Sequence, residues 1–484
     1  MFLRNKFKFF IKRWHGESGY RQVLALAIPL IFSSAAFAIQ LFVDRMFLAW
    51  YSPEAIAATM PAGILNFTVM NLFIGTAGYV GTFVAQYWGA GQYDRIGPIV
   101  WQGFYVAIIA WIVHLMFIPM AGPFFRMVGH APEVQKLEVI YFQIICLGTG
   151  PAVAVAVIAG FFTGRGKPWP VMVVGVTGSI INMCFNYLLI FGCWGLPEMG
   201  VKGAAIATLI ANIFSFLVFS LLLFSQGYEE RFHILSEWKL NTLLFVRLLR
   251  FGLPNGLQFF VGYVGITVFI LLVGRLGTLE LAATNIAFNI NVLAFMPMIG
   301  FGMAVMTLVG QYQGKGRPDL SERSVYSGFH LTYIYMVGIA AAYVLVPDIF
   351  LWPFAAKADP TSFTPIRELT VVLLRFVAVY CLFDTMNIIY ASGIKGAGDT
   401  RFVMLMMFAF SLVGLAIPIY VTLVVLDMGI YAAWTVLTLY IIILSFAFLL
   451  RFMGGKWKSM SVIEVELVST DDSVPVKYDA ISKT

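Results

Sequence analysis

Charged residues are scarce in this chain. Only 11% of its 484 residues are Asp, Glu, Lys or Arg, and 60% are hydrophobic, whereas a soluble protein carries roughly a quarter charged residues. So little polar sequence cannot cover the surface of a large soluble protein. Apolar runs long enough to cross a bilayer recur from about residue 24 to about residue 453. The composition therefore predicts a polytopic helical membrane protein whose surroundings are the lipid bilayer.

Cysteine and histidine are also scarce, and their spacing excludes several kinds of site. The four cysteines lie in or beside apolar runs without paired ligand spacing, so we expect buried free thiols. The five histidines show neither metal-ligand nor triad spacing, and no phosphate-binding loop of the ATPase type occurs. We therefore expect neither an enzyme nor a bound cofactor. Because the net charge of +7 resides in loops and chain ends, we expect no nucleic-acid partner.

The chain contains two copies of one hydrophobic unit. Val84–Gly91 (VAQYWGAG) returns 225 residues later as Val309–Gly316 (VGQYQGKG), and the same offset takes Pro29 to Pro254. Such a repeat predicts two lobes around a central axis. For the repeated Gln-x-x-Gly-x-Gly segment we favour a structural role, because glycine permits a tight reversal between two spans.

We expect twelve membrane spans, six in each lobe. Their approximate residues are 24–50, 55–84, 98–120, 136–161, 168–192, 203–225, 249–273, 280–309, 325–348, 366–392, 401–425 and 430–453. The chain then divides into a basic N-terminal segment (1–23), an N-lobe (24–225), an inter-lobe loop (226–248), a C-lobe (249–453) and a polar tail (454–484). We expect the tail to be disordered beyond about residue 460.

The distribution of Lys and Arg predicts the orientation. The chain ends and the even-numbered loops carry 23 of the 31, the odd-numbered loops carry 6, and Arg45 and Arg375 fall within spans. The positive-inside rule places both termini on the cytoplasmic side of the membrane. We expect this membrane to be the plasma (inner) membrane. Six spans per repeat make both halves enter from the same side, so the lobes should be related by a pseudo-two-fold axis along the membrane normal. We expect a monomer.

Two acidic residues lie within spans, where a charge is costly. They are Asp44 in the first span and Asp384 in the tenth. The 225 offset takes Asp44 to Phe269, and a later offset of 232 takes Asp384 back to Ala152. Neither acid belongs to the repeated scaffold, which favours a functional site over a requirement of the fold.

Structural alternatives exist for both acids. Asp44 could pair with its neighbour Arg45, and Asp384 with Arg375 nine residues earlier, but helical spacing makes both pairs awkward. In the fifth span, Asn182 and Asn186 lie one turn apart and need polar partners, either from another helix or from an ion. The structural alternative for both asparagines is polar contact between neighbouring helices.

These segments resemble the multidrug and toxic compound extrusion (MATE) transporters over nearly the whole chain. The resemblance rests on the twelve spans in two lobes, on the repeated Gln-x-x-Gly-x-Gly, on Val43-Asp44, on Asn182-x-x-x-Asn186 and on Gly203-Ala204-Ala205-x-Ala207-Thr208. It implies an ion-coupling site for a proton or Na⁺ in the N-lobe, formed by Asp44, Asn182, Asn186 and Thr208. It also implies that Asp384 is the acid of the tenth span.

The chain departs from the family pattern at two places. Many members have Asp where this chain has Asn186, so the N-lobe site has one formal charge fewer. Some members carry Glu in the seventh span, but residues 249–273 contain no acid, and Gln258 is the nearest polar candidate. Apart from Na⁺ at Asp44, we expect no metal.

The resemblance implies a secondary antiporter that exports amphipathic, cationic drugs or toxic metabolites by alternating access, in exchange for protons or Na⁺. Phe259 and Tyr263 are candidate walls of the substrate cavity, together with Gln258 and Asn387. One alternative is a lipid-linked oligosaccharide flippase of the same superfamily, which should hold several basic residues in its cavity. Another is a non-transporting membrane scaffold, which would not need an unpaired acidic residue within the spans of only one lobe.

Overall fold

The computed structural model describes residues 13–355 and 360–464. Within these ranges all regular secondary structure is helical, and eleven helices are long and apolar enough to cross a membrane, or twelve if one bent pair counts as a single span. The expected all-α polytopic fold is confirmed.

The helices form two bundles. The N-lobe comprises α2 (Tyr20–Tyr51), α3 (Pro53–Gly78), α4 (Val80–Ala90), α5 (Ile96–Phe117), α6 (Ala121–Val128), α7 (Pro132–Leu147), α8 (Thr149–Gly164), α9 (Trp169–Phe191) and α10 (Gly200–Leu223). The C-lobe comprises α12 (Thr242–Val273), α13 (Thr278–Gly314), α14 (Pro318–Leu345), α15 (Pro347–Ala355), α16 (Pro360–Ala397), α17 (Thr400–Ala409), α18 (Ile417–Tyr420) and α19 (Ile430–Met453). The short helix α11 (Gln226–Phe232) connects them, and two π-helical segments (Phe410–Ala416 and Val421–Val425) flank α18.

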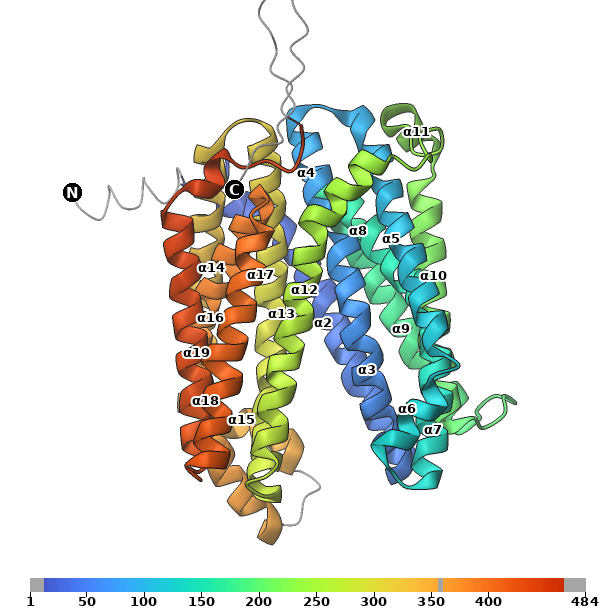
Figure 1. Ribbon diagram of the computed structural model, residues 1–484, viewed down its shortest axis with the longest axis vertical. Helices are drawn as coiled ribbons and strands as arrows, with labels where there is room; N and C mark the ends of the chain where they lie inside the picture. The colour runs from blue at the N-terminus through green and yellow to red at the C-terminus, as the bar shows by residue number, and fades with distance from the viewer. Residues whose placement is uncertain (1–12, 356–359, 465–484) are drawn as a thin grey trace, which may run out of the picture.

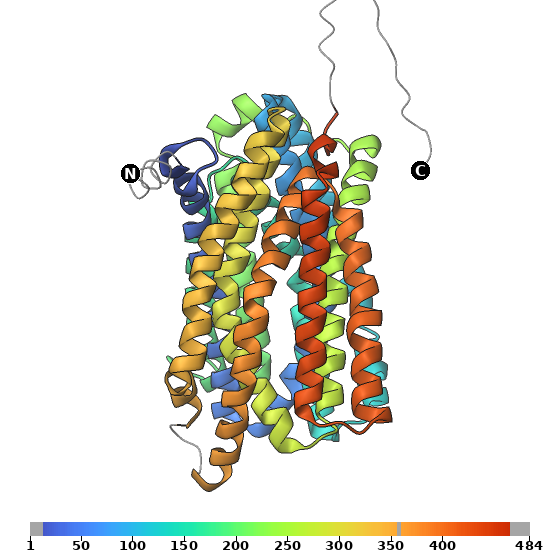
Figure 2. The same ribbon diagram turned by 90° about the vertical axis from the view of Figure 1, so that its left-hand side faces the viewer.

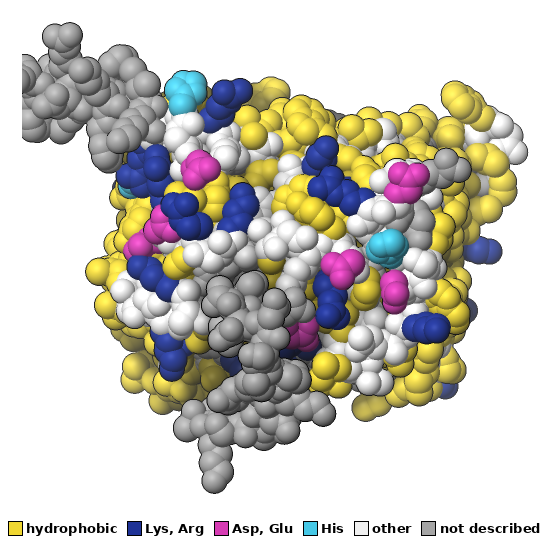
Figure 3. Space-filling model, turned by 90° about the horizontal axis from the view of Figure 1, so that it is seen from above, with side chains coloured by type: hydrophobic (Ala, Val, Ile, Leu, Met, Phe, Trp, Pro, Cys, Tyr) yellow, Lys and Arg dark blue, Asp and Glu magenta, His cyan; other side chains and the backbone are white. Residues whose placement is uncertain are grey.

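The two bundles stand side by side, with their long helices running along the same axis (Figures 1 and 2). The described chain begins and ends at one end of the molecule, drawn at the top, which we call the termini end. The bundles meet at this end and diverge toward the opposite end (Figure 1). Acidic and basic side chains are spread over the termini end, while hydrophobic side chains surround its rim (Figure 3).

Each lobe receives the first turns of the other lobe's first helix. Val23 and Leu26 of α2 lie in the hydrophobic core of the C-lobe. Leu244 and Leu248 of α12 lie in the core of the N-lobe. The 225 offset takes Val23 to Leu248, and both side chains are fully buried. The lobes are therefore interlocked at the termini end by two contacts that obey the sequence repeat.

Glycines let the two lobes approach closely at pseudo-symmetric positions. A Cβ atom added at Gly75 of α3 would lie 2.7 Å from Cα of Gly256 on α12. A Cβ atom added at Gly300 of α13 would lie 2.9 Å from the nitrogen of Ile31 on α2. The 225 offset takes Gly75 to Gly300 and Ile31 to Gly256. The same helix crossing thus occurs twice, as expected for lobes related by a pseudo-two-fold axis.

The fourth expected span, residues 136–161, is bent. It consists of α7 and α8, which meet at an angle of 41° around Gly148. Gly148 and the nearby Gly150 have no side chains at this bend. A Cβ atom added at Gly150 would lie 2.6 Å from Cγ of Trp111. The hydrophobicity of the segment gave no sign of the break.

Two segments that we expected to be non-helical or disordered are packed. Helix α12 begins at Thr242, inside the expected inter-lobe loop, because Leu244 and Leu248 share the buried face while Arg247 and Arg250 lie outside it. The expectation of disorder beyond about residue 460 is wrong for residues 461–464, since Val462 and Ile463 are buried. Residues 1–12 and 465–484, which belong to the expected N-terminal segment and tail, lie outside the described residues.

The contact between α3 and α12 yields a first prediction. In Gly256→Ala the new Cβ atom would lie 2.1 Å from the carbonyl oxygen of Leu72, so the helices must separate. We expect a loss of about 1–3 kcal/mol of stability, measured by thermal unfolding of the purified protein. Gly338→Ala on the exposed face of α14, where a Cβ atom meets nothing within 4 Å, is the control. Equal unfolding curves for the two variants would contradict the predicted crowding.

Candidate functional site

The expected N-lobe site is assembled by three neighbouring helices. Helix α9 packs along α2 on one side and along α10 on the other. Asp44 lies in the second half of α2, Asn182 and Asn186 lie on α9, and Thr208 lies on α10. The two asparagines are four residues apart, so their side chains share one face of α9. Both are fully buried, and Asp44 and Thr208 are half-buried.

A chain of hydrogen bonds joins these four side chains. The Asn186 amide donates to a carboxylate oxygen of Asp44 and also to Oδ1 of Asn182, at 2.9 Å. The Asn182 amide in turn donates to Oγ1 of Thr208 at 3.4 Å. The Thr208 hydroxyl donates to the carbonyl of Ala204 within its own helix. The family resemblance predicted that these residues form one site, and the structure joins all four side chains by hydrogen bonds.

The site has oxygen atoms to spare. Oδ1 of Asn186 is buried and has no hydrogen-bond partner, although a buried acceptor without a partner typically costs about 1–3 kcal/mol. It lies on the side chain that binds the Asp44 carboxylate. Carboxylate and carbonyl oxygens are ligands for hard cations, and a carboxylate also accepts a proton. The donor set therefore suits a small cation or a proton.

The structural alternative for Asp44 does not describe its surroundings. Arg45 has an exposed side chain, and no ion pair joins it to Asp44 among residues 13–355 and 360–464. The carboxylate instead accepts an amide from a different helix. A carboxylate that faces neutral groups inside an apolar lobe is costly to keep charged, which makes it a functional candidate.

Asp384 is the centre of a second polar cluster in the C-lobe. It lies on α16, is only 8% exposed, and accepts a hydrogen bond of 2.8 Å from the Asn387 amide. One turn earlier, the Cys381 thiol donates to Oδ1 of Asn291 on α13. Arg375 has an exposed side chain, and within the described ranges it forms no ion pair with Asp384. Asn387, which we expected in the substrate cavity, is thus a direct partner of the acid.

The other expected cavity residues lie where α12 faces the N-lobe. Phe259 and Tyr263 are 40% and 44% exposed. The Tyr263 ring packs edge-to-face with Phe67 of α3, with ring centroids 5.3 Å apart. Gln258 is half-buried, and its Oε1 atom has no hydrogen-bond partner. This face of α12 is therefore aromatic, partly open and adjacent to the opposite lobe.

A buried base that the sequence did not predict lies next to these aromatic residues. Lys395 is 7% exposed, and its Nζ atom lies 5.3 Å from the centroid of the Phe259 ring. The predicted tenth span, 366–392, leaves Lys395 in the loop that follows, whereas α16 continues to Ala397. Among the described residues, Lys395 and Arg165 are the buried lysine and arginine side chains, one in each lobe. Extending the predicted span by one turn includes Lys395.

Comparison with protein families gives an independent result. The MatE family model matches residues 29–188 and 254–422. The two matches begin at Pro29 and Pro254, 225 residues apart, in agreement with the repeat. The chain belongs to the MatE family. As a member of this family of MATE transporters, it is a transporter and not an enzyme, which confirms the expectation from the sequence.

Curated relatives cover most of the chain. A probable multidrug resistance protein NorM of Thermotoga maritima is 24% identical over 456 residues, which are 93% of this chain and 95% of the relative. The multidrug resistance protein PmpM of Pseudomonas aeruginosa is 28% identical over 407 residues, which are 82% of this chain and 83% of PmpM. The match therefore includes both lobes.

Solved structures share the fold. A MOP superfamily transporter from Pyrococcus furiosus superimposes with a TM-score of 0.83 at 18% identity, covering 92% of this chain and 97% of that one. A multidrug resistance MATE family transporter in an outward-facing conformation gives a TM-score of 0.82 at 18% identity, covering 92% and 98%. The protein is a multi-pass membrane protein with the MATE fold.

The hydrogen-bond chain of the N-lobe site yields a second prediction. Asn186→Leu leaves the Asp44 carboxylate without the amide that it accepts, so we expect a loss of about 1–3 kcal/mol of stability. In an Asp44→Leu background the same change should cost about 1 kcal/mol less, because the carboxylate is gone. Thermal unfolding of the three variants and the wild type measures this coupling. The control is Asn289→Leu, whose amide bonds a carbonyl of its own helix on the exposed face of α13. Additive effects of the two site changes would refute direct coupling.

Proposed function

We propose that this MATE family protein is a secondary active antiporter that exports amphipathic, cationic small molecules in exchange for H⁺ or Na⁺. The observation that carries the proposal is the chain from Asp44 through Asn186 and Asn182 to Thr208, with its unpartnered amide oxygen. The names of the NorM and PmpM relatives, which refer to multidrug resistance, support an export function. A plasma (inner) membrane location and a monomeric state belong to the same proposal.

The orientation that we propose places the termini end in the cytoplasm. The excess of Lys and Arg in the even-numbered loops and chain ends supports it, since cytoplasmic loops are enriched in basic residues. Several of these basic side chains lie on the face seen in Figure 3. In this orientation the lobes are in contact on the cytoplasmic side and diverge toward the outside, so that a substrate would leave outward.

In the proposed cycle, a substrate enters between the lobes from the cytoplasm, the lobes rock, and the substrate is exposed to the outside. A coupling ion that binds at Asp44 then favours substrate release. The ion shifts the lobes only if it binds their two arrangements with different affinity. Helix α2 offers a physical route, because the C-lobe core holds its first turns while Asp44 contacts α9 in the N-lobe. Asp384 is proposed as a second coupling site.

The substrate would contact the partly open face of α12. Phe259 and Tyr263 offer aromatic surfaces to an amphipathic cation. The flippase alternative needs several basic residues in the cavity, but Arg45 and Arg375 are exposed, which leaves Lys395 on this side of the C-lobe. A single buried lysine supports this alternative less well than the acidic and aromatic groups support cation export.

Gradient-driven efflux from vesicles that contain the purified protein tests the proposal. Asp44→Asn should abolish ethidium efflux under the gradient that drives the wild type, because Asn keeps the shape of Asp but cannot bind a proton or carry a charge. Asp384→Asn should impair efflux less. A pH gradient and a Na⁺ gradient, imposed separately, identify the ion. Wild-type efflux by Asp44→Asn would rule out the N-lobe coupling site, and the opposite order of severity would move the main site to Asp384.

Cysteine labelling tests the orientation. Trp194, in the loop between α9 and α10 at the end opposite the termini end, is 91% exposed, and Arg95, between α4 and α5, is also exposed. We expect Trp194→Cys to react with a membrane-impermeant maleimide in intact cells, and Arg95→Cys to react only after the cells are permeabilised. The exposed Cys184 and the half-buried Cys193 are first replaced by Ser. The reverse pattern of labelling would invert the proposed topology.

A further inference from the structure

The repeated Gln-x-x-Gly-x-Gly segments connect the lobes at the termini end. The amide of Gln86 on α4 donates to the carbonyl of Gly396 at the end of α16, at 3.0 Å. The amide of Gln311 on α13 donates to the carbonyl of Gly164 at the end of α8, at 2.8 Å. The offsets of 225 and 232 relate the two donors and the two acceptors. Each lobe therefore presents one glutamine to the other lobe in the same way.

The glycines of these segments bring α4 and α13 into backbone contact. A Cβ atom at Gly89 would lie 1.9 Å from the carbonyl oxygen of Gln311, and one at Gly314 would lie 2.0 Å from that of Gln86. Gly91 and Gly316, with φ of 75° and 67°, then reverse the chain. The expected tight turn is confirmed for Gly91 and Gly316. Gly89 and Gly314 instead allow the two lobes to approach closely. Any side chain there would hold the lobes apart.

The two copies differ at the residue immediately before the first glycine. In the N-lobe this residue is Trp88, whose ring packs against Tyr93 and against Phe232 of α11. In the C-lobe it is Gln313, whose amide donates to three carbonyls of residues 457, 458 and 460, at 2.9–3.0 Å. A different segment thus covers each copy, and over the C-lobe it is the chain that follows α19.

We call Lys456–Glu464 the strap. Its first half belongs to the C-lobe. The Trp457 ring is fully buried and stacks on Phe452 of α19, with centroids 5.0 Å apart, and its Nε1 donates to the carbonyl of Phe452. Lys458 forms an ion pair of 2.8 Å with Glu322 of α14. These contacts, together with Gln313, fix the first half to one lobe.

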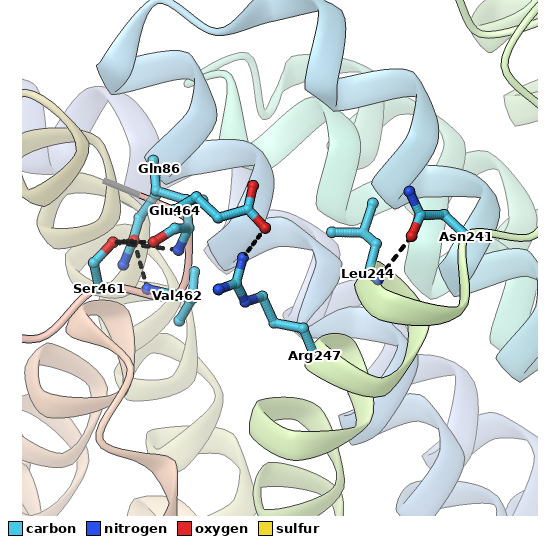
Figure 4. A network of polar contacts seen from close by, with 8 residues as sticks. Gln86, Asn241, Leu244, Arg247, Ser461, Val462 and Glu464 are labelled. Atoms are coloured by element: carbon cyan, nitrogen blue, oxygen red, sulfur yellow. Dashed lines mark hydrogen bonds and ion pairs between the residues drawn. The ribbon is translucent and has the colours of Figure 1, made fainter. Parts of the chain in front are cut away.

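The second half of the strap crosses to the N-lobe. Oε1 of Gln86 accepts two hydrogen bonds of 2.9 Å, from the Ser461 hydroxyl and from the backbone nitrogen of Val462 (Figure 4). Val462 is 1% exposed and lies in the N-lobe hydrophobic core. Glu464 forms an ion pair with Arg247 of α12, as Figure 4 also shows. Arg247 lies on the part of α12 that is packed into the N-lobe, because the neighbouring Leu244 and Leu248 are buried in the N-lobe core.

We propose that the strap is a conformational device that holds the two lobes together at the termini end and must release Gln86 and Arg247 before the lobes can separate there. The two ends of the strap are attached to different lobes, so separation of the lobes breaks the contacts of its second half with Gln86 and Arg247. Gln86 is fully buried, and separation would leave its amide without Gly396, Ser461 and Val462. The strap therefore favours the arrangement that is closed at the termini end. This inference rests on the proposed alternating access of the lobes.

The distance between the lobes tests the strap without any measurement of transport. Spin labels at Asp94→Cys and Asp319→Cys, two exposed positions related by the repeat, report the separation of the lobes at the termini end in lipid nanodiscs. Cys184 and Cys193 are replaced by Ser. The test variant is Ser461→Ala/Glu464→Ala. The matched control is Ser459→Ala/Lys456→Ala, which changes two exposed residues of the strap that do not reach the N-lobe.

Each hydrogen bond shifts an equilibrium by roughly two- to tenfold. We therefore expect the test variant to raise the ratio of separated to closed populations about tenfold or more, with no change in the control. Distance distributions equal to the wild type, or an equal change in the control, would overturn the proposal. The charge swap provides a second check: Arg247→Glu should also favour separation, and adding Glu464→Arg should restore the closed state. Lack of rescue would show that the ion pair between Arg247 and Glu464 does not hold the lobes together. A failure of the proposed export function would appear instead as absence of gradient-driven efflux in the wild type.

Discussion

The close approach of the two lobes at the termini end is the constraint on which the rest of the structure depends. At Gly75, Gly89, Gly300 and Gly314, the absence of a side chain allows the backbone of one lobe to contact the other lobe. These positions form two pairs under the 225 offset, so the sequence repeat and the contact have the same symmetry. Backbone contacts of this kind depend on separation more sharply than contacts between long side chains, because no rotamer change can compensate for a gap. In the proposed transport cycle they would favour two discrete arrangements of the lobes over a continuous range.

Helix α2 connects this contact with the N-lobe site. Its first turns are buried in the C-lobe core, and Ile31 meets Gly300 of α13. Farther along the same helix, Asp44 accepts the amide of Asn186 in the N-lobe. A change of charge at Asp44 alters a bond that fixes one half of α2, while the other half stays with the opposite lobe. In the proposed cycle, ion binding at Asp44 and the position of the lobes would be coupled through this one helix. The corresponding helix α12 interlocks in the same way but carries no acid.

The sequence predicted much of this structure because bilayer insertion leaves few choices. Long apolar runs located the spans, and the cost of a charge in lipid singled out Asp44 and Asp384. The grouping of Asp44 with Asn182, Asn186 and Thr208 came from the family resemblance, and their hydrogen bonds are those of one site. Hydrophobicity could not reveal the bend at Gly148, because α7 and α8 are both apolar. Nor could it place Lys395, whose charge made the end of a buried helix resemble a loop.

The strap shows a deeper reason for such failures. Residues 461–464 form a short, partly polar segment after the last span, so nothing in their local pattern predicts burial. Their position is set by a buried glutamine in the other lobe, 375 residues away, whose oxygen needs donors once the lobes close. Residues that obey the repeat build the closure, because both lobes need the same surface to meet. Residues that break the repeat do something that one lobe alone requires: Asp44 and Asp384 place single acids, and Gln313 holds the strap where Trp88 packs against α11. In this duplicated chain, the proposed coupling acids and the residue that binds the strap therefore depart from the symmetry, while the symmetric positions indicate how the lobes close.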